Sequence, residues 1–424
     1  MVDQNQQPYC LVFGGGGAKG VYHIGVWQAI QEMKIPVNAF IGNSIGAVIA
    51  SFLAQNEEEK LLNIARSINL QTLIRLHKDQ ALADEKSILD HSLIYWQGVY
   101  KNVVNNRGLD TTPMRTLLES SLDEDKIRKN GYDFGITTVN VSDFKPREVF
   151  IEQMEPGQLI NYVMASAAFP GFSRPEINGK KYIDGGIYDN IPYTMARRRG
   201  YRRIILVDIS GIGFNRRPRT EGSETVYIKN SIDMGNAFDF NPDFINRFWQ
   251  LGYLDCMMAF GRLIGYRYFF DETDSSEQQK QQQYNLAAIK TVASKFPDIM
   301  KHDRRLWLKT LEVCAEFFDI ERIKKYSFDE MEETINEQIR AIISDVEKTI
   351  NRYQLERNAK STDILDAYVK DIVESKKIKK NPFFVVRLIN QFERSRALSL
   401  VESTIRRLNP EVSIVEAYCS IKGL

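Results

Sequence analysis

The sequence predicts an α/β protein in which helices cover both faces of a mostly parallel sheet, followed by a helical carboxyl-terminal region. Two observations predict it. From about residue 8 to 215, short β-rich runs alternate with helical patterns, which is typical of parallel sheets. Beyond about residue 270, glycine nearly vanishes and charged helical periodicity dominates. We therefore expect a flexible amino terminus over 1–7, a three-layer α/β/α domain over 8–270 and a helical region over 271–424.

The individual elements of the first region follow from local patterns. The expected strands are Tyr9–Phe13, Ala39–Ile41, Phe134–Val139, Glu148–Ile151 and Arg203–Val207. The expected helices are Gly20–Met33, Ile45–Gln55, Pro113–Ser121 and Ile191–Arg199. Thr112 followed by Pro113 predicts a helix start, with a cap residue and then proline in the first turn.

The region beyond about residue 270 contains patterns that predict helices but no recognisable functional motif. Ser327 and Glu330 form a capping box that opens a long amphipathic pattern from Met331 to Tyr353. The run Gln278–Gln283 is typical of a solvated linker or a helix start.

Composition excludes several classes of protein. With 43% hydrophobic and 26% charged residues the chain is an ordinary globular one, and 56 Lys and Arg balance 55 Asp and Glu. We therefore expect no nucleic-acid partner. The four cysteines are far apart and form no CxxC pair, so neither a zinc site nor a disulfide framework is expected. The polar amino terminus and the lack of ~18 consecutive apolar residues predict a cytoplasmic protein that meets a membrane only from its surface.

A serine stands where an expected strand gives way to an expected helix, in Gly42-Asn43-Ser44-Ile45-Gly46. A serine in such a turn needs a strained backbone, and flanking glycines let neighbouring chain approach closely. This arrangement, the nucleophile elbow, presents the hydroxyl at the amino end of a helix. The pattern alone is a weak signal, and a helix-capping serine is the alternative.

Four glycines, Gly14 to Gly17, follow the first strand and precede a helix. Consecutive backbone N–H groups in such a loop can bind an anion. A Walker loop is excluded because Lys19 is not followed by Ser or Thr, and no acidic residue completes a dinucleotide fingerprint. Two interpretations of the glycine loop remain: a phosphate-binding loop and an oxyanion hole.

A general base is not obvious among the histidines. His23 lies within an expected helix and is interpreted as a packing residue, and His77, His91 and His302 lie in polar or helical stretches without glycine turns. Asp184 instead follows a short apolar run and precedes Gly185 and Gly186. A carboxylate in a partly apolar pocket has a raised pKa and can take a proton from a hydroxyl. A calcium loop or a simple β-turn is the alternative.

Together these stretches resemble the patatin-like phospholipase family. The resemblance rests on the glycine loop at Gly15–Gly20, the serine turn at Gly42–Gly46 and the Asp-Gly-Gly at Asp184–Gly186, in that order. Ala165–Gly171 before the aspartate and Asn190-Ile191-Pro192 after it also fit the family pattern. The resemblance covers about residues 8 to 215.

The resemblance implies a Ser-Asp dyad without histidine, with Ser44 as nucleophile and Asp184 as base. It implies an oxyanion hole from the N–H groups of Gly15, Gly16 and Gly17. The supporting motif positions are Lys19, Gly20, Gly42, Gly46, Gly185 and Gly186. The implied reaction is hydrolysis of an acyl ester of a phospholipid or lysophospholipid through an acyl-Ser44 intermediate, with no metal and no cofactor.

Two positions depart from the family pattern. Asn43 stands where Thr is common, and Lys19 stands where Arg is common, which keeps the charge but loses the bidentate fork. A silent lipid- or nucleotide-binding signalling protein and an acyltransferase using the same dyad are the alternative functions.

Several features could serve contact with lipid or with a partner. The apolar stripe within 244–264 would either face lipid or, as we expect, pack on the core. An arginine cluster within 197–217 could meet anionic headgroups. In the family, appended regions direct membrane binding, oligomerisation or activation, which makes the carboxyl-terminal helices a candidate surface for a regulatory partner or an oligomer.

Overall fold

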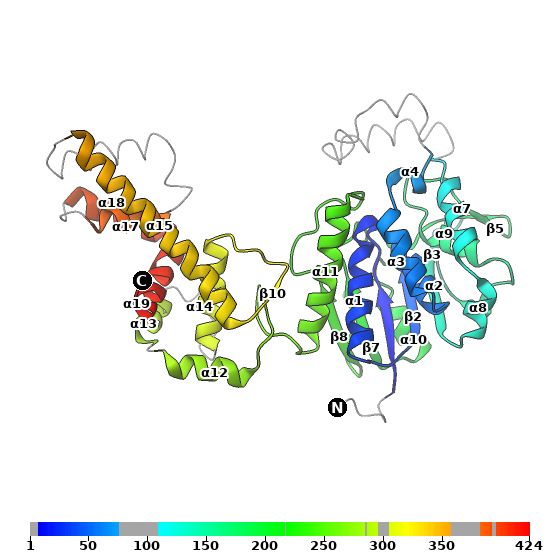
Figure 1. The fold of residues 1–424 in the computed structure, drawn as a ribbon. Coiled ribbons are helices and arrows are strands. Elements are labelled where there is room, and N and C mark those ends of the chain that lie inside the picture. Colours follow the sequence, from blue (N-terminus) through cyan, green and yellow to red (C-terminus); the bar gives the residue numbers. More distant parts are fainter. Residues whose placement is uncertain are drawn as a thin grey trace. The chain divides into compact units, whose positions relative to one another are not determined.

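The computed structural model describes residues 7–75, 109–216, 218–284, 286–295, 305–357, 382–391 and 396–424. The chain forms two compact units, Met1–Gly261 and Arg262–Leu424 (Figure 1). The first unit is built on a central sheet and the second on helices, which confirms the predicted α/β class with a helical carboxyl-terminal region.

The sheet of the first unit has the strand order β5-β6-β3-β2-β1-β7-β8, with β4 beside β3. Its strands are β1 (Tyr9–Phe13), β2 (Val37–Asn43), β3 (Asp133–Asn140), β4 (Pro146–Phe150), β5 (Glu176–Ile177), β6 (Lys180–Asp184), β7 (Arg203–Asp208) and β8 (Glu224–Lys229). The central strands β3, β2, β1, β7 and β8 run parallel, whereas β4 and β6 pair with β3 in the antiparallel sense. The five expected strands are confirmed; β5, β6 and β8 were not expected.

Both faces of this sheet are covered by helices. On one face, Cys10 and Val12 of β1 pack with Tyr193 of α10 (Tyr193–Arg199) in one buried cluster. On the other face, the ring of Phe13 lies 4.7 Å from that of His23 in α1 (Val21–Glu32), and α2 (Ile45–Ala54) packs against β2 and β3. Strands buried on both faces read as continuous apolar runs, which is why β1 and β7 were predictable.

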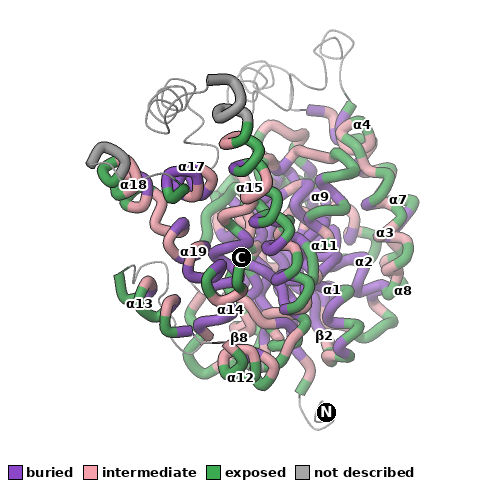
Figure 2. Tube along the Cα trace, turned by 60° about the vertical axis from the view of Figure 1, so that its left-hand side comes forward, coloured by how far each residue is buried: buried purple, intermediate pink, exposed green. Residues whose placement is uncertain are grey.

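The remaining helices of the first unit surround this core. They are η1 (Gly17–Gly20), α3 (Glu58–Ser67), α4 (Leu70–Leu73), α7 (Thr112–Ser121), α8 (Glu124–Lys129), η2 (Ile151–Gln153), α9 (Leu159–Ser166), η3 (Gly185–Ile187) and α11 (Pro242–Ala259). Figure 2 shows buried residues along the strands and α1, and exposed residues along α3, α7 and α8.

The start of α7 differs from the sequence prediction. The cap position is Thr111, one residue before the expected Thr112, and the Thr111 side chain makes no capping bond. The Asp110 carboxylate instead accepts a hydrogen bond from the Thr112 N–H at 2.9 Å. A short acidic side chain one residue earlier therefore satisfies the free N–H.

Helix α11 contains the apolar stripe of the sequence, and this stripe packs on the core. A Cβ on Gly25 of α1 would lie 2.0 Å from the Trp249 carbonyl oxygen, and one on Gly252 would lie 2.1 Å from that of Tyr22. The two helices therefore touch backbone to backbone, which only glycine allows at these positions. Phe244 and Phe248 are buried within the unit, so this stripe is not a lipid-facing surface.

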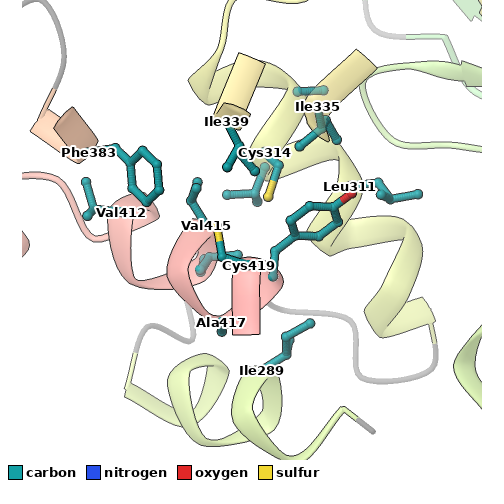
Figure 3. Close-up of a cluster of buried hydrophobic side chains, with 14 of the residues drawn as sticks. Ile289, Leu311, Cys314, Ile335, Ile339, Phe383, Val412, Val415, Ala417 and Cys419 are labelled. Carbon is teal, nitrogen blue, oxygen red and sulfur yellow. The ribbon is translucent and has the colours of Figure 1, made fainter. Parts of the chain in front are cut away.

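The second unit is a helical domain with its own core. It contains α12 (Asp274–Gln283), α13 (Ala287–Lys295), α14 (Leu306–Phe317), α15 (Phe328–Arg357), α17 (Pro382–Ile389), α18 (Arg396–Leu408), α19 (Glu411–Lys422) and the short strands β9 (Phe269–Phe270) and β10 (Lys325–Tyr326). Figure 3 shows Leu311, Ile335, Phe383 and Val415 converging from four of these helices.

Two predictions for this region are tested by the helix starts. The Ser327 hydroxyl accepts a hydrogen bond from the Glu330 N–H at 3.1 Å at the start of α15, which is one of the two bonds of the predicted capping box, and the Glu330 carboxylate pairs with the Lys324 amino group at 2.6 Å. The glutamine-rich run belongs to helix α12, which Thr273 caps. Over the described ranges of the chain, no helix combines the length and the apolar character needed to cross a bilayer.

Candidate functional site

Ser44 occupies a strained turn between β2 and α2. Its backbone angles are φ 54° and ψ −126°, a region that costs a non-glycine residue roughly 1–3 kcal/mol. A Cβ on Gly42 would lie 2.2 Å from the Gly46 carbonyl oxygen, and one on Gly46 would lie 2.6 Å from that of Phe13. Both glycines are therefore required by close approach, and the turn has the geometry that the sequence predicted for a nucleophile elbow.

The turn is held from the side by Ser166, at the end of α9. The Ser44 backbone N–H donates to the Ser166 Oγ at 3.0 Å, and Ser166 Oγ donates to the Thr137 carbonyl oxygen at 2.8 Å. Ser166 is fully buried. Sequence reasoning placed Ser166 only in a segment that fits the family pattern, and its partner at position 44 became visible only in the fold.

Asp184 ends β6 and is buried at the same edge of the sheet. Its Oδ1 accepts hydrogen bonds from the Gly186 N–H at 2.8 Å and from Asn43 Nδ2 at 3.3 Å. Burial raises the pKa of Asp184 to about 6, and hydrogen bonds from Gly186, from the Ser44 side chain and from Asn43 oppose this rise. The fold therefore brings Ser44 and Asp184, far apart in the sequence, to the same cavity, where the Ser44 side chain lowers the pKa of Asp184.

Asn43 connects the serine turn to the other two motifs. Its Nδ2 also donates to Asn190 Oδ1 at 3.3 Å, and Asn190 Nδ2 donates to the Gly15 carbonyl oxygen at 3.2 Å. Asn43 is fully buried. Asn43 and Asn190 thus form a polar chain from the carboxylate of Asp184 to the glycine loop, which sequence reasoning did not foresee.

The glycine loop presents two unoccupied donors. The Gly15 N–H donates to the Asn190 carbonyl oxygen at 3.1 Å, and the Ala18 N–H donates to that of Ala237 at 2.7 Å. Within the described part of the chain, the N–H groups of Gly16 and Gly17 have no such partner. Gly16 and Gly17 also line the cavity that contains Ser44, so they are the loop donors that an incoming oxygen can reach.

Lys19 and the remaining motif glycines lie around this loop. The Lys19 amino group donates to the Ser210 carbonyl oxygen at 3.2 Å, and burial lowers the pKa of Lys19. Gly20 ends η1 against the side chain of Ile45. Gly185 and Gly186 begin η3, directly after Asp184.

His23 is confirmed as a packing residue. It is fully buried, its Nε2–H donates to the Gly14 carbonyl oxygen at 2.8 Å, and burial lowers its pKa to about 4. A neutral histidine used in this way supports the glycine loop and does not face Ser44. His77, His91 and His302 lie outside the described residues.

A cavity opens in front of Ser44. Its polar end consists of Ser44, Asp184, Asn190 and the glycine loop, and its other walls are apolar, with Met114, Phe169, Phe172, Ile212, Phe238 and Phe240 among them. Apolar walls with a few convergent polar groups are typical of a small-molecule site. Among the described residues, no cluster of His, Cys, Asp and Glu could hold a metal ion.

The arginine cluster seen in the sequence is partly paired with carboxylates of the first unit. Arg198 pairs with Glu148 at 3.0 Å, and Arg199 pairs with Asp133 at 2.8 Å. Arg203 pairs with Glu224 at 2.8 Å. Arg217 lies outside the described residues. These three arginines are therefore neutralised by carboxylates of the same unit.

The first unit is thus an α/β domain in which a strained serine turn and a glycine loop with two unoccupied N–H groups line one cavity. Residues 11–197 match the family model described as Patatin-like phospholipase. The family whose model matches these residues is the one that the three motifs predicted.

Curated relatives match the same region. Lysophospholipase NTE1 of Cryptococcus neoformans is 29% identical over 208 residues, which cover 48% of this chain and 11% of that protein. Lysophospholipase NTE1 of Saccharomyces cerevisiae is 28% identical over 247 residues, which cover 56% of this chain and 13% of that protein. The chain thus spans little more than a tenth of the length of these relatives.

Among solved structures, VipD from Legionella pneumophila matches with a TM-score of 0.39 and 14% identity, covering 98% of this chain and 88% of that one. A likeness at that score carries no argument about site or function.

Proposed function

We propose that this chain is a lipid acyl hydrolase that cleaves an acyl ester of a phospholipid or lysophospholipid at Ser44. The observation that carries the proposal is the meeting of Ser44, Asp184 and the two unoccupied N–H groups of Gly16 and Gly17 at one end of an apolar cavity. The similarity to lysophospholipases over this region supports the choice of substrate. The proposal assigns the reaction to the first unit and leaves the helical second unit as a surface for a regulatory partner or a second copy.

In the first step, the Ser44 Oγ attacks the acyl carbonyl carbon while its proton passes to the Asp184 carboxylate. With a pKa of about 6, Asp184 is mostly ionised at neutral pH yet basic enough to share a proton with a hydroxyl. The carbonyl oxygen becomes an oxyanion and accepts hydrogen bonds from Gly16 and Gly17. One such donor contributes roughly 3 kcal/mol of transition-state stabilisation.

In the second step, the bond between the carbonyl carbon and the alcohol oxygen breaks, and Asp184 returns its proton to the leaving alcohol. The acyl group is then esterified to Ser44. Water attacks this ester with Asp184 again accepting a proton, and the fatty acid leaves as Ser44 regains its hydrogen. Gly15 has a supporting role in this scheme, because its N–H is already bonded to the Asn190 carbonyl oxygen.

Contact with a lipid surface is assigned to a patch formed by Ile187, Ile212 and Phe214, called here the Ile212 patch. These side chains are 46%, 66% and 64% exposed. Phe214 donates its N–H to the Gly186 carbonyl oxygen at 2.8 Å, which places it beside Ile187. Ile212 also lines the Ser44 cavity, so the patch borders the route into the site. Exposed apolar side chains at a cavity mouth are typical of lipid contact.

The test measures fatty acid released from micelles of lysophosphatidylcholine and from vesicles of phosphatidylcholine. Wild type should release fatty acid, whereas Ser44→Ala and Asp184→Asn should lose at least a hundredfold in rate. Equal release by all three proteins would end the proposal. To separate hydrolysis from acyl transfer, glycerol is added as an acceptor and the amount of acylated glycerol is measured.

A further inference from the structure

A second cavity lies directly behind the cavity at Ser44, in the first unit. The two share Gly17, Ile45, Ile68, Leu73, Met114 and Phe240 as wall residues. Shared walls make the two cavities direct neighbours. Ile45, the residue directly after Ser44, lines both of them.

The walls of the second cavity are apolar throughout. Helix α2 contributes Val48, Ile49 and Phe52, and helix α3 contributes Leu61, Ile64 and Ala65. No charged, amide or hydroxyl side chain of the described residues lines this cavity. A ligand that fits it must therefore be apolar over its whole inserted length.

The second cavity has buried side chains in its walls on α2 and α3. Phe52 is 1% exposed, Leu61 4% and Ala65 6%. From Ser44 to Phe52 the helix advances eight residues, which corresponds to about 12 Å at 1.5 Å per residue. An unbranched hydrocarbon chain is an apolar ligand that can extend over such a distance along α2.

We propose that the second cavity binds the distal part of one unbranched fatty acyl chain, whose carbonyl end lies at Ser44. The inference rests on the proposed function, because it takes the reacting ester to be at Ser44. It adds a specificity site, in which Ala65 and Phe52 limit the length of the chain. Each additional methylene that enters the cavity should raise kcat/KM about fourfold until the chain reaches Ala65 and Phe52.

Two substitutions change the length of the cavity in opposite directions. Ala65→Phe fills its end, and Phe52→Ala extends it. The control is Asn63→Phe, which places the same ring on the exposed side of α3. The measurement is kcat/KM for p-nitrophenyl esters from butyrate to palmitate. Ala65→Phe should lower the palmitate-to-butyrate ratio at least tenfold, Phe52→Ala should shift the optimum to longer chains, and the control should keep the wild-type ratio.

Binding without turnover gives a second readout. Ser44→Ala should bind cis-parinaric acid, a fluorescent long-chain fatty acid, and adding Ala65→Phe should weaken this binding at least tenfold. If wild type hydrolyses no ester but this chain-length-dependent binding persists, the result contradicts the proposed function and supports the acyl site. Unchanged chain-length ratios in both cavity variants of an active enzyme would overturn the acyl site alone.

Discussion

The side-chain amide of Asn43 donates to the carboxylate of Asp184 at 3.3 Å, and both groups are buried. The same Nδ2 donates to Asn190 at an equal distance, so both of its hydrogens are used. Because Asn43 directly precedes Ser44, this bond fixes the carboxylate relative to the strained turn. It also stabilises the ionised form of Asp184 and opposes the rise in pKa that burial causes.

Replacing Asn43 by alanine should raise the pKa of Asp184 further, because a hydrogen bond to the charged form is lost. Asp184 must be ionised to accept the proton of Ser44, so activity should rise with pH through about 6 in wild type. In Asn43→Ala this midpoint should move to higher pH, with about tenfold lower kcat/KM at pH 7. Asn43→Thr, which restores a donor, should recover part of the loss. A lower rate with an unmoved midpoint would contradict this role for Asn43.

Ser166→Ala removes the acceptor of the Ser44 N–H. The N–H is left without its partner next to a strained residue, which should cost about 1–3 kcal/mol in stability and lower kcat more than it changes KM. The matched control is Ser120→Ala, at an exposed position at the end of α7. Chemical denaturation and initial rates on the same preparations provide the measurement. Similar effects of the two substitutions would show that the Ser166 bond does not support the turn.

Much of the site was predictable because its parts are local patterns. The turn around Ser44 and the loop from Gly14 to Gly17 each follow a buried parallel strand, and the apolar runs of these strands are visible in the sequence. The short strands β5 and β6 were missed because β6 begins with Lys180 and Lys181 and lies near the sheet edge, where pattern signals are weak.

The connections between the parts were not predictable. Ser166 meets Ser44 across 122 positions, and Asn43 meets Asn190 across 147. Such partners depend on how β6 and α9 pack against β3, which no local pattern encodes. The apolar stripe of α11 is a further example. Lipid-facing and core-facing helices have the same periodicity, so only the contact between α11 and α1 shows that this stripe faces the core.

The raised pKa of Asp184 also predicts a pH-dependent stability. A carboxyl whose pKa rises from 3.8 to about 6 on folding stabilises the folded state below pH 4, and this contribution is lost as the pH rises through 6. The shift corresponds to about 3 kcal/mol. About 1 kcal/mol of this change has already occurred at pH 4.5, so Asp184→Asn should gain about 2 kcal/mol of stability over wild type between pH 4.5 and 7.5. The pKa of Asp189 is also raised to about 6. Asp189 is present in both proteins, so its contribution cancels in the difference between their free energies of unfolding.

The measurement is denaturant unfolding at the two pH values, with the exposed Asp125→Asn as control. A stability difference between Asp184→Asn and wild type that stays constant with pH would contradict the raised pKa.

The Ile212 patch predicts a separation of lipid binding from chemistry. Phe214→Glu should weaken binding to phosphatidylcholine vesicles at least tenfold, because a charge replaces an exposed apolar ring. Hydrolysis of a dispersed short-chain ester should change much less. Leu408→Glu, at a similarly exposed apolar position in the second unit, is the control. Vesicle co-sedimentation that is equal for wild type and Phe214→Glu would exclude this patch as the lipid contact.

The most direct test of the central claim is the rate and position of labelling by a long-chain fluorophosphonate, followed by peptide mapping. We expect one label per chain, on Ser44, with none on Ser44→Ala and labelling at least a hundredfold slower on Asp184→Asn. Labelling at another residue, or equal rates with and without the Asp184 carboxylate, would contradict a nucleophile at Ser44 that is activated by Asp184.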